Sequence, residues 1–380
     1  MKDNPLLKLE SYGQSIWMDY IRRNSLDSGE LKRFIEEDDI SGVTSNPSIF
    51  EKAIAGSHDY DDAIRTLAQK GTGPEDIFQQ LAIEDIQRAA DLFRPMYERL
   101  EGKDGFVSIE VSPRLAYDTA GTISEARRLW AAVARPNIFI KVPATREGLP
   151  AIQQLISEGI NVNITLLFGL PRYREVAEAY VSGLEALVAR GKPVDRIASV
   201  ASFFLSRIDV LLDPQLEKIQ SAGGRIAGIA ASLHGMTAIF SARVAYDIYR
   251  KFFSGERFQN LAKNGARTQR LLWASTSTKN PQYSDVKYAE ALIAPETIDT
   301  MPVETILAYR DHGKPAPDTL LIDPDRSCKV RERLAEVGID LDQVTQQLED
   351  EGVQKFNTAF EQLLAAIREK REIALRQPVD

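Results

Sequence analysis

The chain of 380 residues contains a single cysteine, Cys328, and only three histidines. One cysteine cannot form an internal disulfide, and the first ten residues lack the apolar core of a signal peptide, so we expect a reducing, cytoplasmic compartment. His58, His234 and His312 are far apart in the sequence, and no cysteine joins them. The sequence therefore offers neither metal-ligand spacing nor a Ser-His-Asp set, and we expect no metal and no other cofactor.

Long apolar runs, basic blocks and glycine-rich phosphate motifs are also missing. With 47 basic and 55 acidic residues and a net charge of −8, we expect no nucleic acid or membrane surface as a partner. The longest uncharged stretch, residues 226–242, is too short and too polar to span a bilayer, and we expect a buried helix there. Neither G-x-G-x-x-G nor G-x-x-x-x-G-K-[ST] occurs, which argues against a doubly wound nucleotide-binding sheet.

Short β-rich runs alternate with longer helical patterns along most of the chain, which is typical of βα units around a parallel sheet. Residues 171–190, for example, carry an apolar stripe of helical period that ends at a glycine. Eight runs are candidate strands: residues 15–18, 42–45, 106–111, 138–142, 160–167, 197–204, 271–274 and 288–293. Eight such units predict a (β/α)8 TIM-type barrel.

The sequence changes character after Pro302, where a Pro- and Asp-rich loop precedes a long amphipathic pattern. Asp340 followed by Gln343 resembles a helix N-terminal cap. We expect residues 1–302 to form the catalytic barrel. Residues 303–380 are predicted to be a helical extension that packs on the barrel and is not a separate domain.

Polar residues alternate with apolar ones in the run 160–166. Asn161, Asn163 and Thr165 share one face of the expected strand, and only aliphatic residues occupy the other. A half-solvated antiparallel strand would have the same pattern, but the surrounding βα units favour a face that lines a pocket.

A lone lysine, Lys141, ends the apolar run 138–142. Burying an ammonium group without a partner is costly, so such a lysine is either a nucleophile toward carbonyl groups or the partner of a carboxylate on a neighbouring strand. Glu110 and Asp19 also follow apolar runs. Each is a candidate general acid or base, or a counter-charge for Lys141.

Other polar residues stand near predicted strand ends, where barrel enzymes place their active sites. Thr44 and Asn46 share a face before a tight turn, and Asn46 either orients a substrate hydroxyl or closes an Asx-turn before Pro47. Arg207 and Lys279 follow late strands and are candidate cations for an anionic ligand. The alternative for Arg207 is a surface ion pair with Asp209.

Six segments resemble the transaldolase family, in its longer bacterial-type form, and they occur in the family's order. They are SGVTSNPSIF at 41–50, VSIEVSPR at 107–114, IFIKVPAT at 138–145, GINVNITLLF at 159–168, VASFFLSR at 200–207 and WASTSTK at 273–279. The resemblance runs from about residue 15 to residue 302 and implies an α/β barrel. Shorter members carry Arg after the seventh strand, where this chain has Lys279 two residues later.

The resemblance implies that Lys141 forms a Schiff base with the C2 carbonyl of sedoheptulose 7-phosphate or fructose 6-phosphate. Asp19 would take the proton of the C4 hydroxyl as the C3–C4 bond breaks. A dihydroxyacetone unit would remain on Lys141 and pass to glyceraldehyde 3-phosphate or erythrose 4-phosphate, within the non-oxidative pentose phosphate pathway.

The resemblance also implies roles for the remaining site residues. Glu110 and Thr165 would hold a water that serves imine formation and hydrolysis. Substrate hydroxyls would be bound on one side of the site, and the sugar phosphate on another. The hydroxyl side comprises Thr44, Asn46, Asn163 and Ser202, with Phe204 closing the pocket, and the phosphate side comprises Arg207, Ser275 and Lys279.

Two other functions remain open at this point. A fructose 6-phosphate aldolase-type lyase would release dihydroxyacetone instead of transferring it, although such barrels are much shorter than this chain. A non-catalytic sugar-phosphate-binding barrel would use Lys141 only as an ion-pair partner. The sequence does not determine the oligomeric state, and a homodimer is one assembly that it allows.

Overall fold

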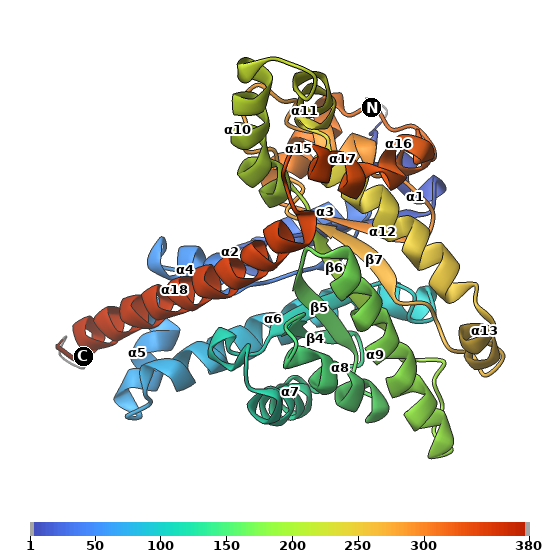
Figure 1. Cartoon of the computed structure of the whole chain (residues 1–380). Coiled ribbons are helices and arrows are strands. Elements are labelled where there is room, and N and C mark those ends of the chain that lie inside the picture. Colours follow the sequence, from blue (N-terminus) through green and yellow to red (C-terminus); the bar gives the residue numbers. More distant parts are fainter. Residues whose placement is uncertain (1–3, 377–380) are drawn as a thin grey trace.

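The computed structural model describes residues 4–376 and contains eight parallel strands closed into a barrel (Figure 1). The strands pair in chain order, and the first closes against the last. They are β1 (Gln14–Met18), β2 (Ile40–Val43), β3 (Phe106–Glu110), β4 (Ile138–Pro143), β5 (Val162–Leu167), β6 (Ser199–Phe204), β7 (Arg270–Ala274) and β8 (Thr297–Met301). The predicted (β/α)8 barrel is confirmed.

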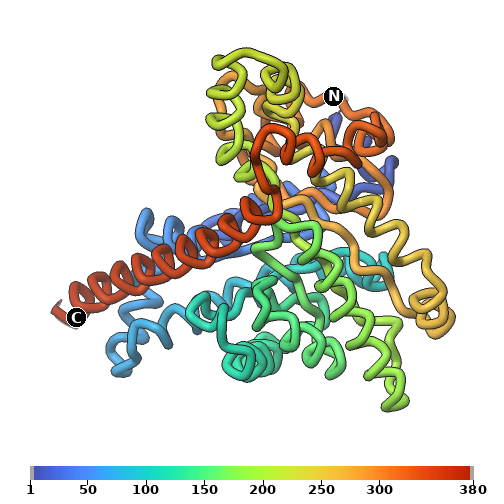
Figure 2. The backbone as a smooth tube through the Cα atoms, in the orientation of Figure 1, coloured from blue at the N-terminus to red at the C-terminus, as the bar shows by residue number. Residues whose placement is uncertain are grey.

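Helices surround the barrel, and at least one follows each strand (Figure 2). Helix α1 (Leu6–Ser11) precedes β1, and the others are, in chain order, α2 (Arg23–Asp27), α3 (Glu30–Asp38), α4 (Pro47–Ala55), α5 (Asp61–Gln69), α6 (Pro74–Arg99), η1 (Pro113–Leu115), α7 (Thr119–Val133), α8 (Gly148–Ser157), α9 (Leu170–Ala189), α10 (Ser206–Ala222), α11 (Ala227–Leu233), α12 (Thr237–Phe253), α13 (Glu256–Ala262), α14 (Lys287–Ala291) and α15 (Val303–His312). Within residues 4–376, none of the helices combines the length and apolar character that a membrane crossing requires.

Two predicted elements were wrong. Residues 288–293 belong largely to α14, and the eighth strand is residues 297–301. A short apolar run fits a buried helical turn as well as a strand, and Asp299 made the true strand look polar. Residues 226–242 form two helices instead of one, because the chain turns at Gly235 (φ +68°), a conformation that favours glycine.

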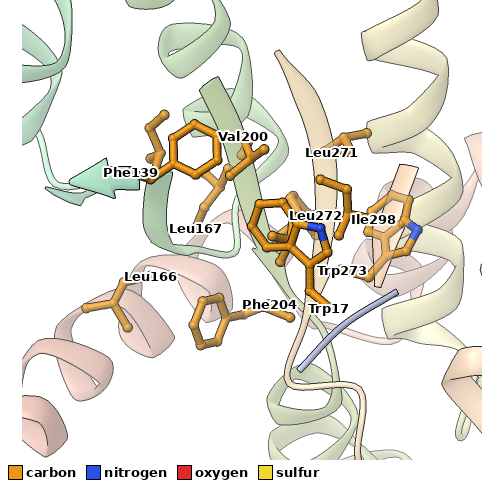
Figure 3. Packing of buried hydrophobic residues seen from close by; sticks show 14 of the residues in the cluster. Trp17, Phe139, Leu166, Leu167, Val200, Phe204, Leu271, Leu272, Trp273 and Ile298 are labelled. Atoms are coloured by element: carbon orange, nitrogen blue, oxygen red, sulfur yellow. The ribbon is translucent and has the colours of Figure 1, made fainter. Parts of the chain in front are cut away.

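The barrel interior has an apolar layer and a polar layer. Toward the amino ends of the strands, rings and aliphatic side chains fill the interior. Trp17, Phe139, Val200 and Ile298 are buried there (Figure 3), and so is Phe106. Two residues further along the same strands stand Asp19, Ser108, Lys141, Ser202 and Thr300. Because side chains alternate with a period of two, these residues also point inward and form a polar layer nearer the carboxyl ends.

A helical tail follows the barrel and consists of η2 (Thr319–Leu321), α16 (Pro324–Cys328), α17 (Val330–Glu336) and α18 (Leu341–Arg376). The Asp340 Oδ1 accepts hydrogen bonds from the backbone N–H groups of Asp342 (2.9 Å) and Gln343 (3.3 Å), so the predicted cap is confirmed. Helix α18 packs along α4 and α5 and passes the end of β5 (Figure 1). There, a Cβ atom on Gly352 would lie 2.9 Å from Leu166 Cδ2, so a larger residue would require the Leu166 side chain to move.

Candidate active site

A cavity of about 680 Å³ opens at the carboxyl ends of the strands, next to the polar layer. The structure brings most of the predicted site residues to its wall: Asp19, Thr44, Asn46, Lys141, Ser202, Phe204, Arg207, Ser275 and Lys279. Glu110, Asn163 and Thr165 are not on the wall itself. Register pairs Glu110 with Lys141, Lys141 with Asn163, and Pro143 with Thr165, so all three lie on the strands beside the lysine.

A second cavity, of about 430 Å³, lies at the opposite end of the barrel. One of the cations that line it, Arg270, donates to Asp104 Oδ2 (3.1 Å), Ser15 Oγ and the Thr297 carbonyl, and Asp104 Oδ1 also accepts from Trp17 Nε1 (2.7 Å). This network closes the amino end of the barrel. The cavity at the carboxyl ends is therefore the better candidate for chemistry.

Lys141 is buried, with 4% of its surface exposed. Its Nζ donates a hydrogen bond to the Ser45 carbonyl (3.1 Å) and lies 3.7 Å from Glu110 Oε2. The carboxylate expected on a neighbouring strand is thus present, but 3.7 Å is too long for a direct hydrogen bond. The amine faces the cavity. Among residues 4–376, its only hydrogen-bond partner is the Ser45 carbonyl.

Burial raises the pKa of Glu110 to about 7, and the nearby charge of Lys141 opposes that rise. Neither carboxyl oxygen has a hydrogen-bond partner among the described residues, and the same holds for the buried Thr165 hydroxyl. A carboxyl group with a pKa near neutrality can both accept and return a proton under ordinary conditions.

Asp19 follows β1, and its backbone N–H continues the ladder by donating to the Met301 carbonyl (2.8 Å). Its Oδ1 accepts from the Thr44 hydroxyl (2.7 Å), and Thr44 Oγ1 is also 2.8 Å from Thr300 Oγ1. Burial raises the pKa of Asp19, while Lys141 and the Thr44 hydrogen bond lower it. Asp19 is therefore held in a fixed orientation near the amine.

Asn163 lies at the centre of a hydrogen-bond chain across the interior. Its Nδ2 donates to Ser108 Oγ (3.0 Å), and its Oδ1 accepts from Ser202 Oγ (2.6 Å). Asn46 caps α4, because its Oδ1 accepts from the Ile49 N–H (3.0 Å). The oxygen therefore makes a helix N-cap bond, three residues along the chain, instead of the Asx-turn that was the alternative. The residue also lines the cavity, which leaves its amide N–H groups for a ligand.

Arg207 begins α10 beside Phe204, with its guanidinium carbon 5.7 Å from the ring centroid. Burial lowers the pKa of Arg207, and the charges of Glu351 and Asp19 oppose that shift. The ion pair with Asp209 does not form, because Asp209 accepts instead from the Ala238 N–H and the Tyr288 hydroxyl. Arg207 Nη1 is buried and has no hydrogen-bond partner within residues 4–376.

The loop after β7 supplies the other predicted phosphate ligands. Ser275 has φ +57° and its Oγ lies 2.9 Å from Ser206 Oγ, which joins this loop to the start of α10. Lys279 is exposed at the cavity rim, where its Nζ donates to Ser277 Oγ. The two cations thus differ, since Arg207 is largely enclosed and Lys279 is open to water.

Sequence reasoning missed several residues of the cavity wall. Thr300 was missed because β8 was placed too early, although the alternation in residues 297–301 before Pro302 is a strand signal. Phe356 of α18 was interpreted only as part of a packing face, yet it is buried and lines the cavity. No local pattern distinguishes it from its apolar neighbours. Tyr20, Arg22, Glu30 and Lys52 also contribute to the rim.

Comparison with known proteins gives one family. Residues 16–367 match the family model described as Transaldolase/Fructose-6-phosphate aldolase. The chain is 46% identical to a transaldolase of Saccharopolyspora erythraea, over 96% of this chain and 97% of the relative. It is 46% identical to a transaldolase of Trichodesmium erythraeum (97% and 98%) and 47% identical to transaldolase 2 of Nostoc punctiforme (98% and 99%).

Proposed function

The chain belongs to the transaldolase/fructose-6-phosphate aldolase family, and from this premise we propose that it is a transaldolase acting through a Schiff base on Lys141. The substrates would be a ketose phosphate donor, sedoheptulose 7-phosphate or fructose 6-phosphate, and an aldose phosphate acceptor. The observation that carries the proposal is the placement of Lys141: a buried amine in the polar layer, facing the cavity, with Glu110 on the neighbouring strand β3 and Asp19, which follows β1, on the same cavity wall.

The first half-reaction begins when the unprotonated Lys141 amine attacks the C2 carbonyl of the donor. Glu110 and Thr165, whose polar atoms have no partner among the described residues, would hold the water molecule that leaves as the imine forms. Because its pKa is near 7, Glu110 can deliver and recover the protons of this step. Asn163, Asn46 and Ser202 would bind the carbinolamine and the substrate hydroxyls.

Bond cleavage uses the protonated imine as an electron sink. Asp19 would take the proton of the C4 hydroxyl, the C3–C4 electron pair moves toward the imine nitrogen, and the aldose phosphate leaves. The product on Lys141 is a three-carbon enamine. In the second half-reaction, the enamine carbon attacks the aldehyde of the acceptor, and Asp19 returns its proton to the new alcohol. The hydrogen bond from Thr44 would keep Asp19 oriented throughout.

The sugar phosphate would lie against Arg207, Ser275 and Lys279 at the mouth of the cavity, while Phe204 closes the pocket. Arg207 offers a largely enclosed guanidinium group whose Nη1 has no partner among the described residues, and Lys279 offers an exposed point charge at the rim. The pocket would therefore discriminate against sugars that lack a phosphate.

The mechanism proposed requires no metal, because the imine performs the electron withdrawal. We also propose that the protein acts in the cytoplasm, in the non-oxidative pentose phosphate pathway. Residues 1–302 would form the barrel, and residues 303–380 would pack on it so that the two parts form one unit.

The absence of a metal from the proposed mechanism can be tested with a chelator. EDTA should leave activity unchanged. Strong inhibition that a divalent ion reverses would overturn the metal-free mechanism.

The experiment that tests transfer compares two incubations with fructose 6-phosphate, one with erythrose 4-phosphate and one without. A transaldolase produces sedoheptulose 7-phosphate in the first incubation and at most one dihydroxyacetone equivalent per enzyme in the second. Steady release of dihydroxyacetone without acceptor would identify a lyase instead. No turnover in either incubation would favour a sugar-phosphate-binding barrel.

A further inference from the structure

Two aspartates of α10 hold three separate segments of the chain together on the side of the barrel that carries Arg207. Asp209 Oδ1 accepts from the Ala238 N–H (2.8 Å), and its Oδ2 accepts from the Tyr288 hydroxyl (2.8 Å). One turn later, Asp213 Oδ1 accepts from the Gly235 N–H (2.8 Å), and its Oδ2 accepts from the Tyr283 hydroxyl (2.8 Å). Each aspartate thus binds one backbone amide and one tyrosine.

Tyr283 belongs to the loop of residues 275–286, which also carries Ser275 and Lys279. Within this loop, the Tyr283 N–H donates to the Asn280 carbonyl (3.1 Å) and the Thr278 hydroxyl donates to the Ser284 carbonyl (2.7 Å). The segment between Lys279 and Tyr283 is therefore a compact turn. A displacement of Tyr283 would be transmitted to Lys279 through that turn.

The Tyr283 side chain fits its place closely. Its hydroxyl is 3.3 Å from His234 Nδ1, and Lys287 Nζ lies 3.6 Å from the centre of its ring. A Cβ atom on Gly235 would lie only 2.6 Å from the Tyr283 hydroxyl oxygen. The loop is thus attached to α10 by a half-buried, charge-assisted hydrogen bond, while His234 and Lys287 contact the Tyr283 ring.

Arg207 and Asp213 lie on the same helix, six residues or about 9 Å apart along its axis. Arg207 and Lys279 come from different segments. Near the cavity these segments are joined by the hydrogen bonds of the Leu205 N–H to the Ala274 carbonyl (3.1 Å) and of the Ser206 N–H to the Ser275 carbonyl (3.1 Å), and by the Ser206–Ser275 hydroxyl contact. We propose that Tyr283, through Asp213, is a positioning residue that sets the distance between Arg207 and Lys279 and so determines the affinity for the phosphate group of the substrate.

This inference rests on the proposed function, because it presupposes that Arg207 and Lys279 bind the sugar phosphate. Tyr283 itself does not line the cavity, so it acts only through the loop. The substitution Tyr283→Phe removes one hydroxyl and keeps the ring. Tyr246→Phe is the control, because the half-buried Tyr246 hydroxyl also donates a hydrogen bond (3.0 Å), to the Pro295 carbonyl, outside this loop.

The test measures kcat and KM for glyceraldehyde 3-phosphate and for unphosphorylated glyceraldehyde as acceptors, with sedoheptulose 7-phosphate held at saturation as the donor. In Tyr283→Phe, we expect KM for the phosphorylated acceptor to rise about three- to tenfold, since loss of a charge-assisted hydrogen bond loosens the loop. KM for glyceraldehyde and kcat for both acceptors should stay within about twofold, as should all constants of Tyr246→Phe. An unchanged KM for the phosphorylated acceptor, or equal rises for both acceptors, would overturn the proposal.

A double variant tests whether the effect of Tyr283 passes through Asp213, which a general loss of structure would not show. In Asp213→Asn combined with Tyr283→Phe, the KM effect should equal that of the stronger single variant, because both changes break the same link. Additive effects would refute a path through Asp213. If the proposed function itself fails, the unmodified protein will not transfer the three-carbon unit to either acceptor, which separates that failure from the failure of this inference.

Discussion

Glu110 and Lys141 stand opposite each other on neighbouring parallel strands, with Glu110 Oε2 3.7 Å from Lys141 Nζ. The separation exceeds a direct hydrogen bond but keeps the two groups electrostatically coupled, since the charge of Lys141 restrains the rise in the Glu110 pKa. Both side chains are about 5% exposed. The pair therefore places a proton carrier beside the reactive amine.

The substitution Glu110→Gln should slow imine formation and imine hydrolysis without abolishing either step. It removes the proton carrier but preserves the shape of the side chain, so we expect kcat to fall by about 10²- to 10⁴-fold. Rapid-mixing measurements of imine formation and hydrolysis should assign the loss to these steps. Unchanged kcat would exclude Glu110 from the proposed acid–base role.

Glu110 should also affect stability in a pH-dependent way. Its pKa in the folded protein, about 7, exceeds the ordinary value of 4.5, so the native state binds the proton more tightly than the unfolded state. The resulting stabilisation is complete below pH 4.5 and is lost as the pH rises through 7. Relative to the unmodified protein, Glu110→Gln should therefore be more stable at pH 8 than at pH 5 in urea unfolding. The opposite trend would contradict the raised pKa.

Asp19→Asn should separate imine formation from bond cleavage. An asparagine keeps a hydrogen-bond acceptor for Thr44 but cannot take the proton of the C4 hydroxyl. We expect borohydride to trap the donor on Lys141 as efficiently as before, while release of the aldose phosphate slows by about 10²- to 10⁴-fold. Equal loss of trapping and cleavage would indicate that Asp19 only maintains the structure of the site.

Arg207→Ala should weaken the binding of phosphorylated substrates selectively. A hydrogen bond to a charged group contributes about 1.5–3 kcal/mol, so KM for fructose 6-phosphate should rise by about ten- to a hundredfold. KM for an unphosphorylated acceptor should change little. Arg127→Ala, at an exposed pair with Glu158, is the control. A similar change for both kinds of substrate would place Arg207 outside the phosphate site.

Asp104→Ala should destabilise the amino end of the barrel. The change removes the carboxylate that pairs with the Arg270 guanidinium and leaves the indole N–H of Trp17 without its buried acceptor, so the free energy of unfolding should fall by about 3–5 kcal/mol. Asp91→Ala breaks an exposed pair with Arg135 and should cost less than about 1 kcal/mol. Denaturant titration measures both, and equal losses would contradict a stabilising role for the buried network.

Sequence reasoning located most of the barrel because strand and helix periodicities are local properties. It also singled out Lys141, because burying a lone charge in an apolar strand is costly unless the group is paired or functional. It misplaced β8, where Asp299 and two threonines disguise a buried strand. A buried acid in the middle of a strand is a tertiary feature that a single sequence does not reveal.

Tertiary contacts also explain the other differences. Asp209 lies two residues after Arg207, yet distant partners, the Ala238 N–H and the Tyr288 hydroxyl, occupy its oxygens. Phe356 reaches the cavity because α18 packs along α4, a contact between segments some 300 residues apart in the chain. Such long-range pairings depend on the whole fold and not on local spacing.

The most direct test of the Schiff-base mechanism is reduction with borohydride in the presence of fructose 6-phosphate, followed by intact-mass and peptide mass spectrometry. The mechanism predicts one reduced three-carbon unit on the unmodified protein, located on Lys141. It also predicts no adduct in Lys141→Met and an unchanged adduct in Lys251→Met, which alters an exposed lysine. An adduct on another lysine, or none in the unmodified protein, would contradict the Schiff-base mechanism.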